Sequence, residues 1–324
     1  MYHRTRGFTG HEREVYKSLI SSLIHEGRVI DSTFLDDQPN LPPTFAGIRF
    51  DCLLNINKKI CPIFILQFYK SVRIIRNLNG TISIAFVINN FEITLSLEEF
   101  ARILKIPCQG VCVYTPEWPI SSLQNGVDSN PDNYPPPHED SSLIRDALFY
   151  ERTQPKTRKM KGVDTILDPF QMIVSELKID LKKWEIILSQ NAISLTGNKD
   201  HPNACLCYML YCLTIGKPFN LSYYIANRMV SVTKCTDMTL PYGMLLTRLF
   251  KHVSVNHPYY FSNELYLVDH VMIPLSEKRV FRFKHEGKRP RLPTPTPSNS
   301  ESSDSPSPTP HQGVENDPVK NYTL

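Results

Sequence analysis

The side chains that could hold a metal ion are one histidine and three cysteines in the middle of the chain: His201, Cys205, Cys207 and Cys212. Their spacing comes nearest in this sequence to a nucleocapsid zinc knuckle, in which a short loop surrounds the ion tetrahedrally. Cys205 and Cys207, however, fall on different faces of the helix that we expect there, because residues two apart diverge on a helix. We therefore expect small apolar core residues rather than metal ligands, and no cofactor.

Several catalytic sites can be tested against the sequence in the same way. A reverse transcriptase needs paired aspartates at a tight hairpin to hold two metal ions, but the neighbours Asp36 and Asp37 precede a Gln-Pro step in a loop. A retroviral protease needs an Asp-Thr/Ser-Gly turn, and the sequence contains none. We expect no enzyme, no catalytic residue and no small-molecule ligand. The alternative is an enzyme whose site is assembled from scattered residues such as Glu99, Asp168 and His201.

Two stretches of the chain concentrate positive charge. The first carries five positive charges and no negative one: Arg152, Lys156, Arg158, Lys159 and Lys161. It favours a solvated loop face, with a phosphate-contacting patch as the alternative. The second begins the C-terminal tail and is typical of a nuclear import signal or a nucleic-acid contact: Lys284, Lys288, Arg289 and Arg291. An ordinary solubilising tail explains this run at least as well, because short basic runs are frequent by chance.

The composition limits the class of protein. The chain has 324 residues, 41% hydrophobic and 21% charged, enough for one large core or two modest ones, and its 26 prolines indicate a part without regular structure. The net charge of +4 is too small to identify a nucleic-acid binder by itself. Eight cysteines in mostly apolar surroundings, with no secretory leader before them, predict an intracellular protein, which the basic tail would direct to the nucleus. The longest apolar run, Ala204 to Ile215, is shorter than the ~20 residues that cross a bilayer, so we expect no membrane partner.

The clearest local pattern runs from Cys61 to Pro107. Apolar residues at three- and four-residue steps from Phe64 to Ile75 predict an amphipathic helix. Alternating residues on both sides of an Asn-Asn step then predict a β-hairpin at about 81–95. Ser96 and Glu99 match a capping box, which opens a short helix through Leu104. Earlier, we expect a small helix that ends at Gly27, a loop from Asp31 to Pro43, and either helix or strand from Phe50 to Ile56.

The second half of the chain reads as helical. Spacing predicts helices around Leu143–Leu148, from the Asp168-Pro169 entry through Leu177, and around Leu181–Leu188. His201-Pro202 opens an apolar helix, Ala204 to Ile215, that Gly216 ends. Asn220 is expected to cap the next helix, through Val232, and Leu240 to Gly243 introduces one more, through Phe250.

These patterns predict a mainly α-helical α+β protein, with a helical core, one β-hairpin and a disordered C-terminal tail. We expect a disordered N-terminus at 1–10, a part with helix, hairpin and helix at 11–115, and a Pro-rich loop or linker at 116–140. A helical part at 141–275 is expected to pack on the first as one domain. The Pro- and Ser-rich residues 286–324 cannot offset their ordering entropy and should be disordered.

Four stretches carry a resemblance to a known family: Ile63–Tyr69, Phe91–Gly110, Gly216–Asn220 and, above all, Leu240–Phe250. In their order they resemble the plant transposon protein family, which comprises domains of retroelement-derived plant reading frames. The resemblance covers about Arg28 to Pro258. It implies an origin in a mobile element and a capsid-like or adaptor role. The family has no established catalytic residues, so none is carried over.

The sequence thus favours a non-enzymatic interaction or assembly protein derived from a plant mobile element, associated with nucleic acid through its basic segments or with further copies of itself. The alternatives are an enzyme with an unrecognised site and a degenerate reading frame without a cellular role. The preference rests on the strong patterns, each of which is explained by packing or capping.

Overall fold

The computed structural model describes residues 24–78, 80–125, 141–151, 157–160, 163–166, 172–194, 200–234, 239–259 and 274–275. All of them belong to one compact unit, Met1–Arg279, and Val280–Leu324 forms a second unit. The predicted disordered segments 1–10 and 286–324, the helix before Gly27 except for Ile24, and residues 126–140 of the linker lie outside the described residues.

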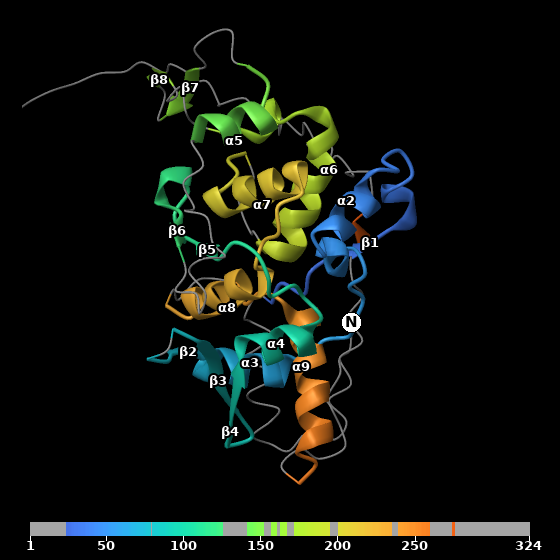
Figure 1. Ribbon diagram of the computed structural model, residues 1–324, viewed down its shortest axis with the longest axis vertical. Helices are drawn as coiled ribbons and strands as arrows, with labels where there is room; N and C mark the ends of the chain where they lie inside the picture. The colour runs from blue at the N-terminus through green and yellow to red at the C-terminus, as the bar shows by residue number, and fades with distance from the viewer. Residues whose placement is uncertain are drawn as a thin grey trace, which may run out of the picture. The chain divides into compact units, whose positions relative to one another are not determined.

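Within this described part the chain is a mainly helical α+β protein, as predicted (Figure 1). Eight α-helices are present: α2 (Leu41–Gly47), α3 (Pro62–Ser71), α4 (Leu97–Leu104), α5 (Ser141–Leu148), α6 (Lys182–Ile187), α7 (Ala204–Ile215), α8 (Leu221–Val232) and α9 (Gly243–Asn256). The strands are β1 (Val29–Ile30), β2 (Arg73–Arg76), β3 (Ile82–Ile88), β4 (Phe91–Ser96), β5 (Val113–Tyr114), β6 (Gln124–Asn125), β7 (Thr157–Met160), β8 (Val163–Ile166) and β9 (Pro274–Leu275). No helix among these residues is long and apolar enough to span a bilayer.

The predicted hairpin is confirmed in β3 and β4. The two strands pair antiparallel from Ile88↔Phe91 to Ser83↔Ser96. Asn89 and Asn90 have φ of 49° and 62°, the left-handed pair that a two-residue hairpin turn requires. The predicted cap is also present, because the Ser96 hydroxyl accepts a hydrogen bond from the Glu99 N–H at 3.1 Å at the start of α4.

The helix before the hairpin is shorter than predicted. It ends at Ser71, and the chain continues as β2, a third strand that pairs antiparallel with β3 from Arg73↔Ala85 to Arg76↔Ile82. The prediction that Val72 and Ile75 belong to the helix is therefore wrong. The Ser71 hydroxyl accepts a hydrogen bond from the Val87 N–H at 2.8 Å, so strand pairing begins where the helix stops. β-branched residues in this run favour the pleated conformation once a partner strand is available.

The sequence predicts a helix from Asp168-Pro169 through Leu177. This prediction is wrong for the residues that the structure describes, from Met172 onward. Ile173 is extended, and Val174–Glu176 forms a single 3-10 turn. The backbone of this segment bonds to distant residues instead: the Tyr150 N–H donates to the Glu176 carbonyl, and the Val174 N–H donates to the Asp200 carbonyl. The periodicity of the sequence depends only on neighbouring residues, so it cannot reveal hydrogen bonds to distant parts of the chain.

Smaller differences concern where helices begin. Pro42 and Pro43, expected in a loop, lie in the first turn of α2, where a missing N–H costs nothing. Asn203 rather than the His201-Pro202 step caps α7, through a 2.8 Å hydrogen bond from the Leu206 N–H. The stretch left open at 50–56 contains a 3-10 helix, Phe50–Leu53.

Other predicted ends are confirmed. Gly216 ends α7 with a φ of 68°. Asn220 caps α8 by accepting a hydrogen bond from the Tyr223 N–H at 2.9 Å. α6 follows Leu181 and continues as a π-helix, Leu188–Ala192.

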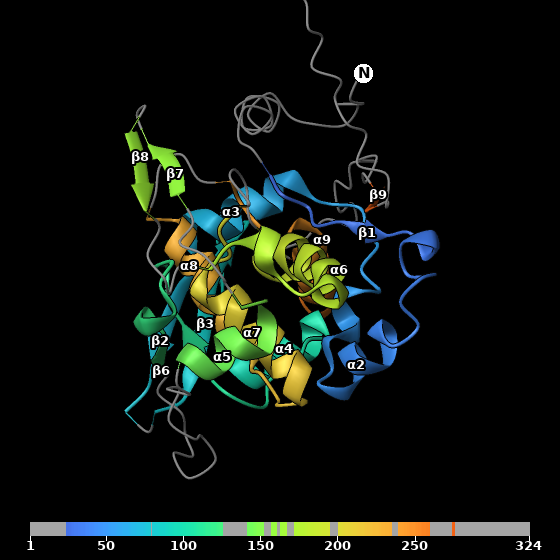
Figure 2. The same ribbon diagram turned by 90° about the horizontal axis from the view of Figure 1, so that it is seen from above.

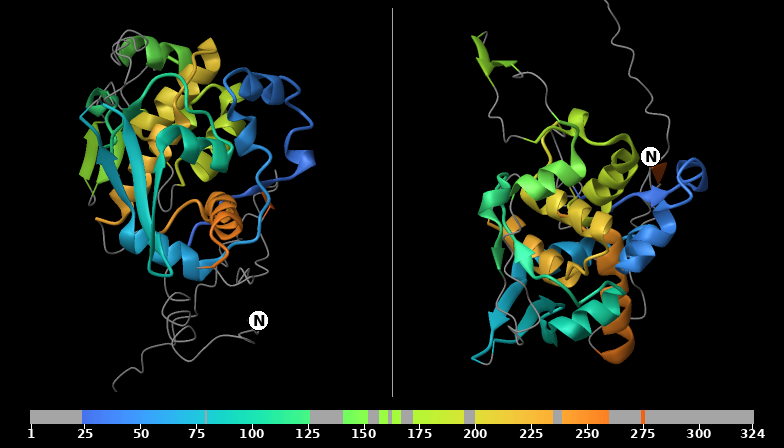
Figure 3. Two further views of the ribbon diagram at one scale, coloured as in Figure 1. Left: turned by 60° about the horizontal axis from the view of Figure 1, so that its bottom comes forward. Right: turned by 45° about the horizontal axis from the view of Figure 1, so that its top comes forward.

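One hydrophobic cluster draws on residues from both halves of the sequence. Phe250 of α9 packs edge-on against Phe64 of α3, with ring centroids 5.5 Å apart. Phe50 and Phe219 meet in the same way at 6.1 Å. α7, buried on nearly all sides, contacts α2, α5 and α6 (Figures 2 and 3). α2, α5 and α6 thus pack around α7, and the three-stranded sheet of β2, β3 and β4 packs against α3 and α4.

Candidate functional site

Two residues of the predicted basic patch fall in the β7–β8 hairpin. Arg158 and Lys159 lie in β7, and Arg152, Lys156 and Lys161 lie outside the described residues. The strand register pairs Arg158 with Thr165 and Lys159 with Asp164. Residues directly opposite each other in an antiparallel pair share one face of the ribbon. The pairing therefore places an acidic position beside a basic one. This acidic position lies outside the run from Arg152 to Lys161, so the charge count of that run does not include it.

The second basic segment and part of the alternative catalytic set lie outside the described residues. This holds for Lys284, Lys288, Arg289 and Arg291 and for Asp168. Glu99, the other carboxylate of that set, is engaged locally, because it pairs with Arg102 at 3.7 Å on α4.

The cysteines considered as metal ligands are core residues of α7. Cys205, Cys207 and Cys212 are buried and form no disulfide. Burial raises the pKa of Cys205 to about 12, and its thiol donates to the Thr115 carbonyl at 3.6 Å. Burial also raises the pKa of Cys207, helped by Cys205 and Glu185. Metal binding needs thiolates. Among the described residues no three or more His, Cys, Asp or Glu side chains are grouped to hold a metal ion.

An open groove of about 790 Å³ separates the loop before α2 from the start of α6. Lys183 pairs with Asp37, donates to the Phe34 carbonyl at 2.8 Å and lies 5.0 Å above the Phe34 ring. Gln38 donates to the Asp180 carbonyl at 3.3 Å across the groove. Two of the charged side chains at the groove, Asp37 and Lys183, are thus used to hold its two walls together, while Asp180 and Lys182 are exposed. The accessible lining also includes apolar surface, chiefly Ile179, 66% exposed, and Trp184.

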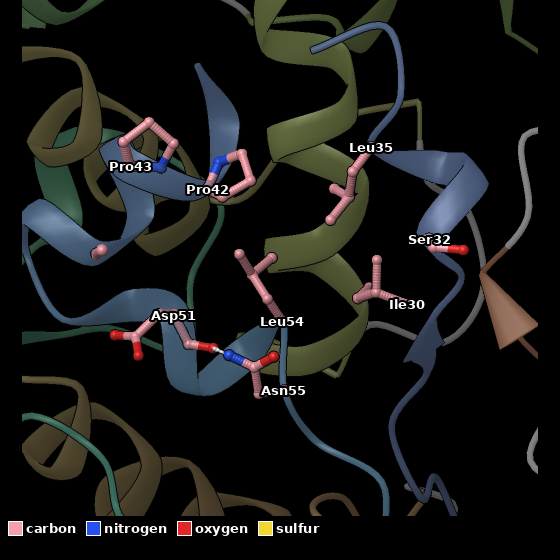
Figure 4. Close-up of a pocket in the computed structure, with 9 residues that line it drawn as sticks. Ile30, Ser32, Leu35, Pro42, Pro43, Asp51, Leu54 and Asn55 are labelled. Carbon is pink, nitrogen blue, oxygen red and sulfur yellow. Dashed lines mark hydrogen bonds between the residues drawn. The ribbon is translucent and has the colours of Figure 1, made fainter. Parts of the chain in front are cut away.

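A second open pocket, of about 550 Å³, lies on the other side of α2 (Figure 4). Figure 4 shows Leu35, Leu54 and Ile30 converging, while the Asp51 carboxylate lies to one side. Asn55 donates to the Asp51 backbone carbonyl at 3.1 Å. Both hollows can receive an apolar side chain of a partner, and neither gathers groups for acid–base work.

The most unusual electrostatic arrangement surrounds Arg228 of α8. Its guanidinium lies among the phenols of Tyr114, Tyr224 and Tyr242. Burial raises the pKa of each phenol. The Arg228 Nε and the Tyr114 hydroxyl are buried without a hydrogen-bond partner of ordinary geometry. Sequence reasoning did not single out Arg228, although its position, four residues after Tyr224 and four before Val232, lies on the buried stripe of α8. This helical spacing is the sequence feature that could have shown that Arg228 faces the core.

None of the family models, curated proteins or solved structures compared with this chain matches it. The resemblance noted in the sequence therefore stays a prediction.

Proposed function

We propose that this chain is a non-enzymatic interaction or assembly protein, derived from a plant mobile element, that associates with nucleic acid through its basic segments. The observation that carries the proposal is that cysteine thiols, which could otherwise act as nucleophiles or metal ligands, are buried in the core. The thiols of Cys205 and Cys207 are buried in α7, and burial raises the pKa of both. A protonated thiol is a poor nucleophile and a poor ligand.

Buried polar side chains likewise join segments of the chain. Asn191, in the π-helix, donates to the Arg28 and Leu53 carbonyls at 3.0 and 2.9 Å and accepts from the Arg28 N–H at 2.7 Å. Thr247 donates to the Lys59 carbonyl at 2.6 Å. Polar groups satisfied in this way stabilise the scaffold instead of facing a substrate.

Because these buried side chains serve the scaffold, we assign the recognition of partners to the surface of the protein. The basic run from Arg152 to Lys161 supplies phosphate contacts, and the run from Lys284 to Arg291 supplies more, together with a signal for nuclear import. The open apolar hollows beside α2 suit contacts between protein chains.

The experiment is size-exclusion chromatography of the full chain with light scattering, with and without single-stranded RNA, at about 50 mM and about 200 mM salt. We expect oligomers, or RNA complexes whose stability falls steeply between the two salt concentrations. A monomer that elutes identically with and without RNA at both concentrations would contradict the proposal.

A further inference from the structure

Arg228 carries a positive charge that no described carboxylate pairs with. Its side chain is half-buried on α8, and its Nε–H has no acceptor. Tyr114, on the neighbouring strand β5, lies beside the guanidinium, and its hydroxyl also lacks a hydrogen-bond partner of ordinary geometry. Ser231, one turn further along α8, lies next to the same hydroxyl. The Tyr114 hydroxyl thus lies within reach of the guanidinium and of Ser231, but neither it nor the Arg228 Nε–H makes a hydrogen bond of ordinary geometry.

Three further polar groups around Arg228 do not neutralise its charge. The Tyr69 hydroxyl donates to the Pro241 carbonyl at 2.7 Å, and the Tyr242 hydroxyl donates to the Ala192 carbonyl at 2.7 Å. The Cys205 thiol donates to the Thr115 carbonyl at 3.6 Å. Each of these groups is a neutral donor bonded elsewhere, so none of them supplies a negative charge.

A guanidinium stays protonated in proteins, so the charge cannot be removed by loss of a proton. A charge that is partly removed from water and has no counter-charge is unfavourable. The site consequently favours a ligand that brings negative charge and several acceptor oxygens. A phosphate group meets both needs, because its oxygens match the fork of a guanidinium and can accept further hydrogen bonds from hydroxyl groups.

We propose that Arg228, Tyr114 and Ser231 form a binding site for a phosphate group. The phosphate comes either from a small phosphate compound or from a nucleic-acid backbone. The guanidinium supplies the charge, and the two hydroxyls of Tyr114 and Ser231 fix the orientation of the oxygens. The site uses none of the residues of the basic segments in the proposed function, so each proposal can fail without the other.

The test measures binding of inorganic phosphate to the full-length protein by isothermal titration calorimetry and by thermal unfolding, with sodium chloride at equal ionic strength as the reference. We expect saturable binding and a rise in Tm for the unaltered protein. Arg228→Met should abolish both effects, and Tyr114→Phe should weaken binding about tenfold, the effect of one hydrogen bond to a charged group. Arg102→Met removes a solvent-exposed arginine from α4 and serves as the matched control, with binding unchanged.

A short single-stranded RNA then distinguishes the two sources of phosphate. Competition between the RNA and inorganic phosphate at this site identifies a backbone phosphate as the ligand, and binding of inorganic phosphate without competition identifies a small compound. Absence of saturable phosphate binding to the unaltered protein would overturn the proposal, as would equal binding by Arg228→Met. If Arg228→Met fails to fold, Tyr114→Phe decides, because an unchanged phosphate affinity in that variant also overturns the proposal.

Discussion

The backbone of Gly110 lies directly against the backbone of Pro218. A Cβ added at Gly110 would stand 2.2 Å from the Pro218 carbonyl carbon, and Gly110 has a φ of +105°. Beside it, the Val111 N–H donates to the Pro218 carbonyl and the Asn220 N–H donates to the Val111 carbonyl, each at 3.0 Å. Two segments more than a hundred residues apart are therefore joined backbone to backbone.

Gly110→Ala should lower the free energy of unfolding by about 3 kcal/mol or more, because an L-residue at this φ is strained and its side chain would overlap a backbone that cannot yield. Urea unfolding followed by circular dichroism measures the change.

Gly47→Ala is the matched control. Gly47 lies at the end of α2 with open space around its α-carbon and an ordinary φ, so the same substitution there should change stability by no more than about 1 kcal/mol, and in the stabilising direction. Equal effects of the two substitutions would show that the two backbones do not approach as described.

Asn220 reinforces the same junction with its side chain. Its Oδ1 accepts from the Tyr223 N–H and the Ser222 hydroxyl, and its Nδ2 donates to the Cys108 carbonyl at 2.9 Å. Asn220→Ala should cost about 3 kcal/mol, since it removes a helix cap and leaves buried partners unsatisfied.

Asn203→Ala provides the comparison. Asn203 caps α7 through one hydrogen bond, to the Leu206 N–H, at a less buried position. Its loss should cost about 1 kcal/mol, the usual worth of a cap. Thermal and urea unfolding of both variants would test the difference, and similar costs would mean that the bond from Asn220 to Cys108 contributes nothing.

Local signals predicted the parts of the fold that depend on neighbouring residues. Ser96 and Asn220 act within three residues, Gly216 ends the helix that precedes it, and Asn89-Asn90 turns the chain between adjacent strands, so short patterns were sufficient. Strand β2 was missed because it depends on pairing with β3, and the extended Ile173 was missed because its segment bonds to distant parts of the chain.

The candidate sites, like the fold, combine features that neighbouring residues determine with features that depend on distant contacts. The basic run around Arg158 was visible in the sequence, but the position of Asp164 beside Lys159 depends on strand register. The surroundings of Arg228 come from α3, β5, α7, α8 and the residues before α9, which no sequence window spans. Only its position on the apolar stripe of α8 was available beforehand.

The buried thiols predict a loss of stability in alkali. Burial raises the pKa of Cys52 and of Cys205 to about 12. The folded state therefore keeps its protons where the unfolded chain, with thiols of ordinary pKa near 8.5, releases them. The stabilising effect is complete below about pH 8.5 and is lost as the pH rises toward 12, by up to about 1.4 kcal/mol per pH unit for each thiol.

Urea unfolding under reducing conditions at about pH 8, 9 and 10 would measure this loss. Cys205→Ala should reduce the slope of stability against pH, whatever its effect at neutral pH, because one titrating thiol has been removed. Identical slopes for the variant and the unaltered protein would contradict the assignment to Cys205.

The register of the β7–β8 hairpin makes the proposed nucleic-acid contact testable at a single acidic residue. Asp164 opposes Lys159, so its negative charge weakens the attraction of the ribbon for a phosphate backbone. Asp164→Asn should strengthen RNA binding severalfold at low salt. Replacement of Arg158 and Lys159 by Gln should weaken binding and reduce the slope of log K against log salt by about 1.4, or 0.7 for each lost phosphate contact with a single strand.

Both substitutions have controls of equal charge on other surfaces. Asp180→Asn removes an exposed acid near α6, where only its backbone carbonyl is bonded to Gln38, and Lys70→Gln with Lys251→Gln removes two exposed lysines from α3 and α9. These controls change the net charge as much but leave the ribbon intact. If they alter RNA affinity and its salt dependence as strongly as the hairpin variants do, binding follows the overall charge of the protein, and the β7–β8 ribbon is not the contact.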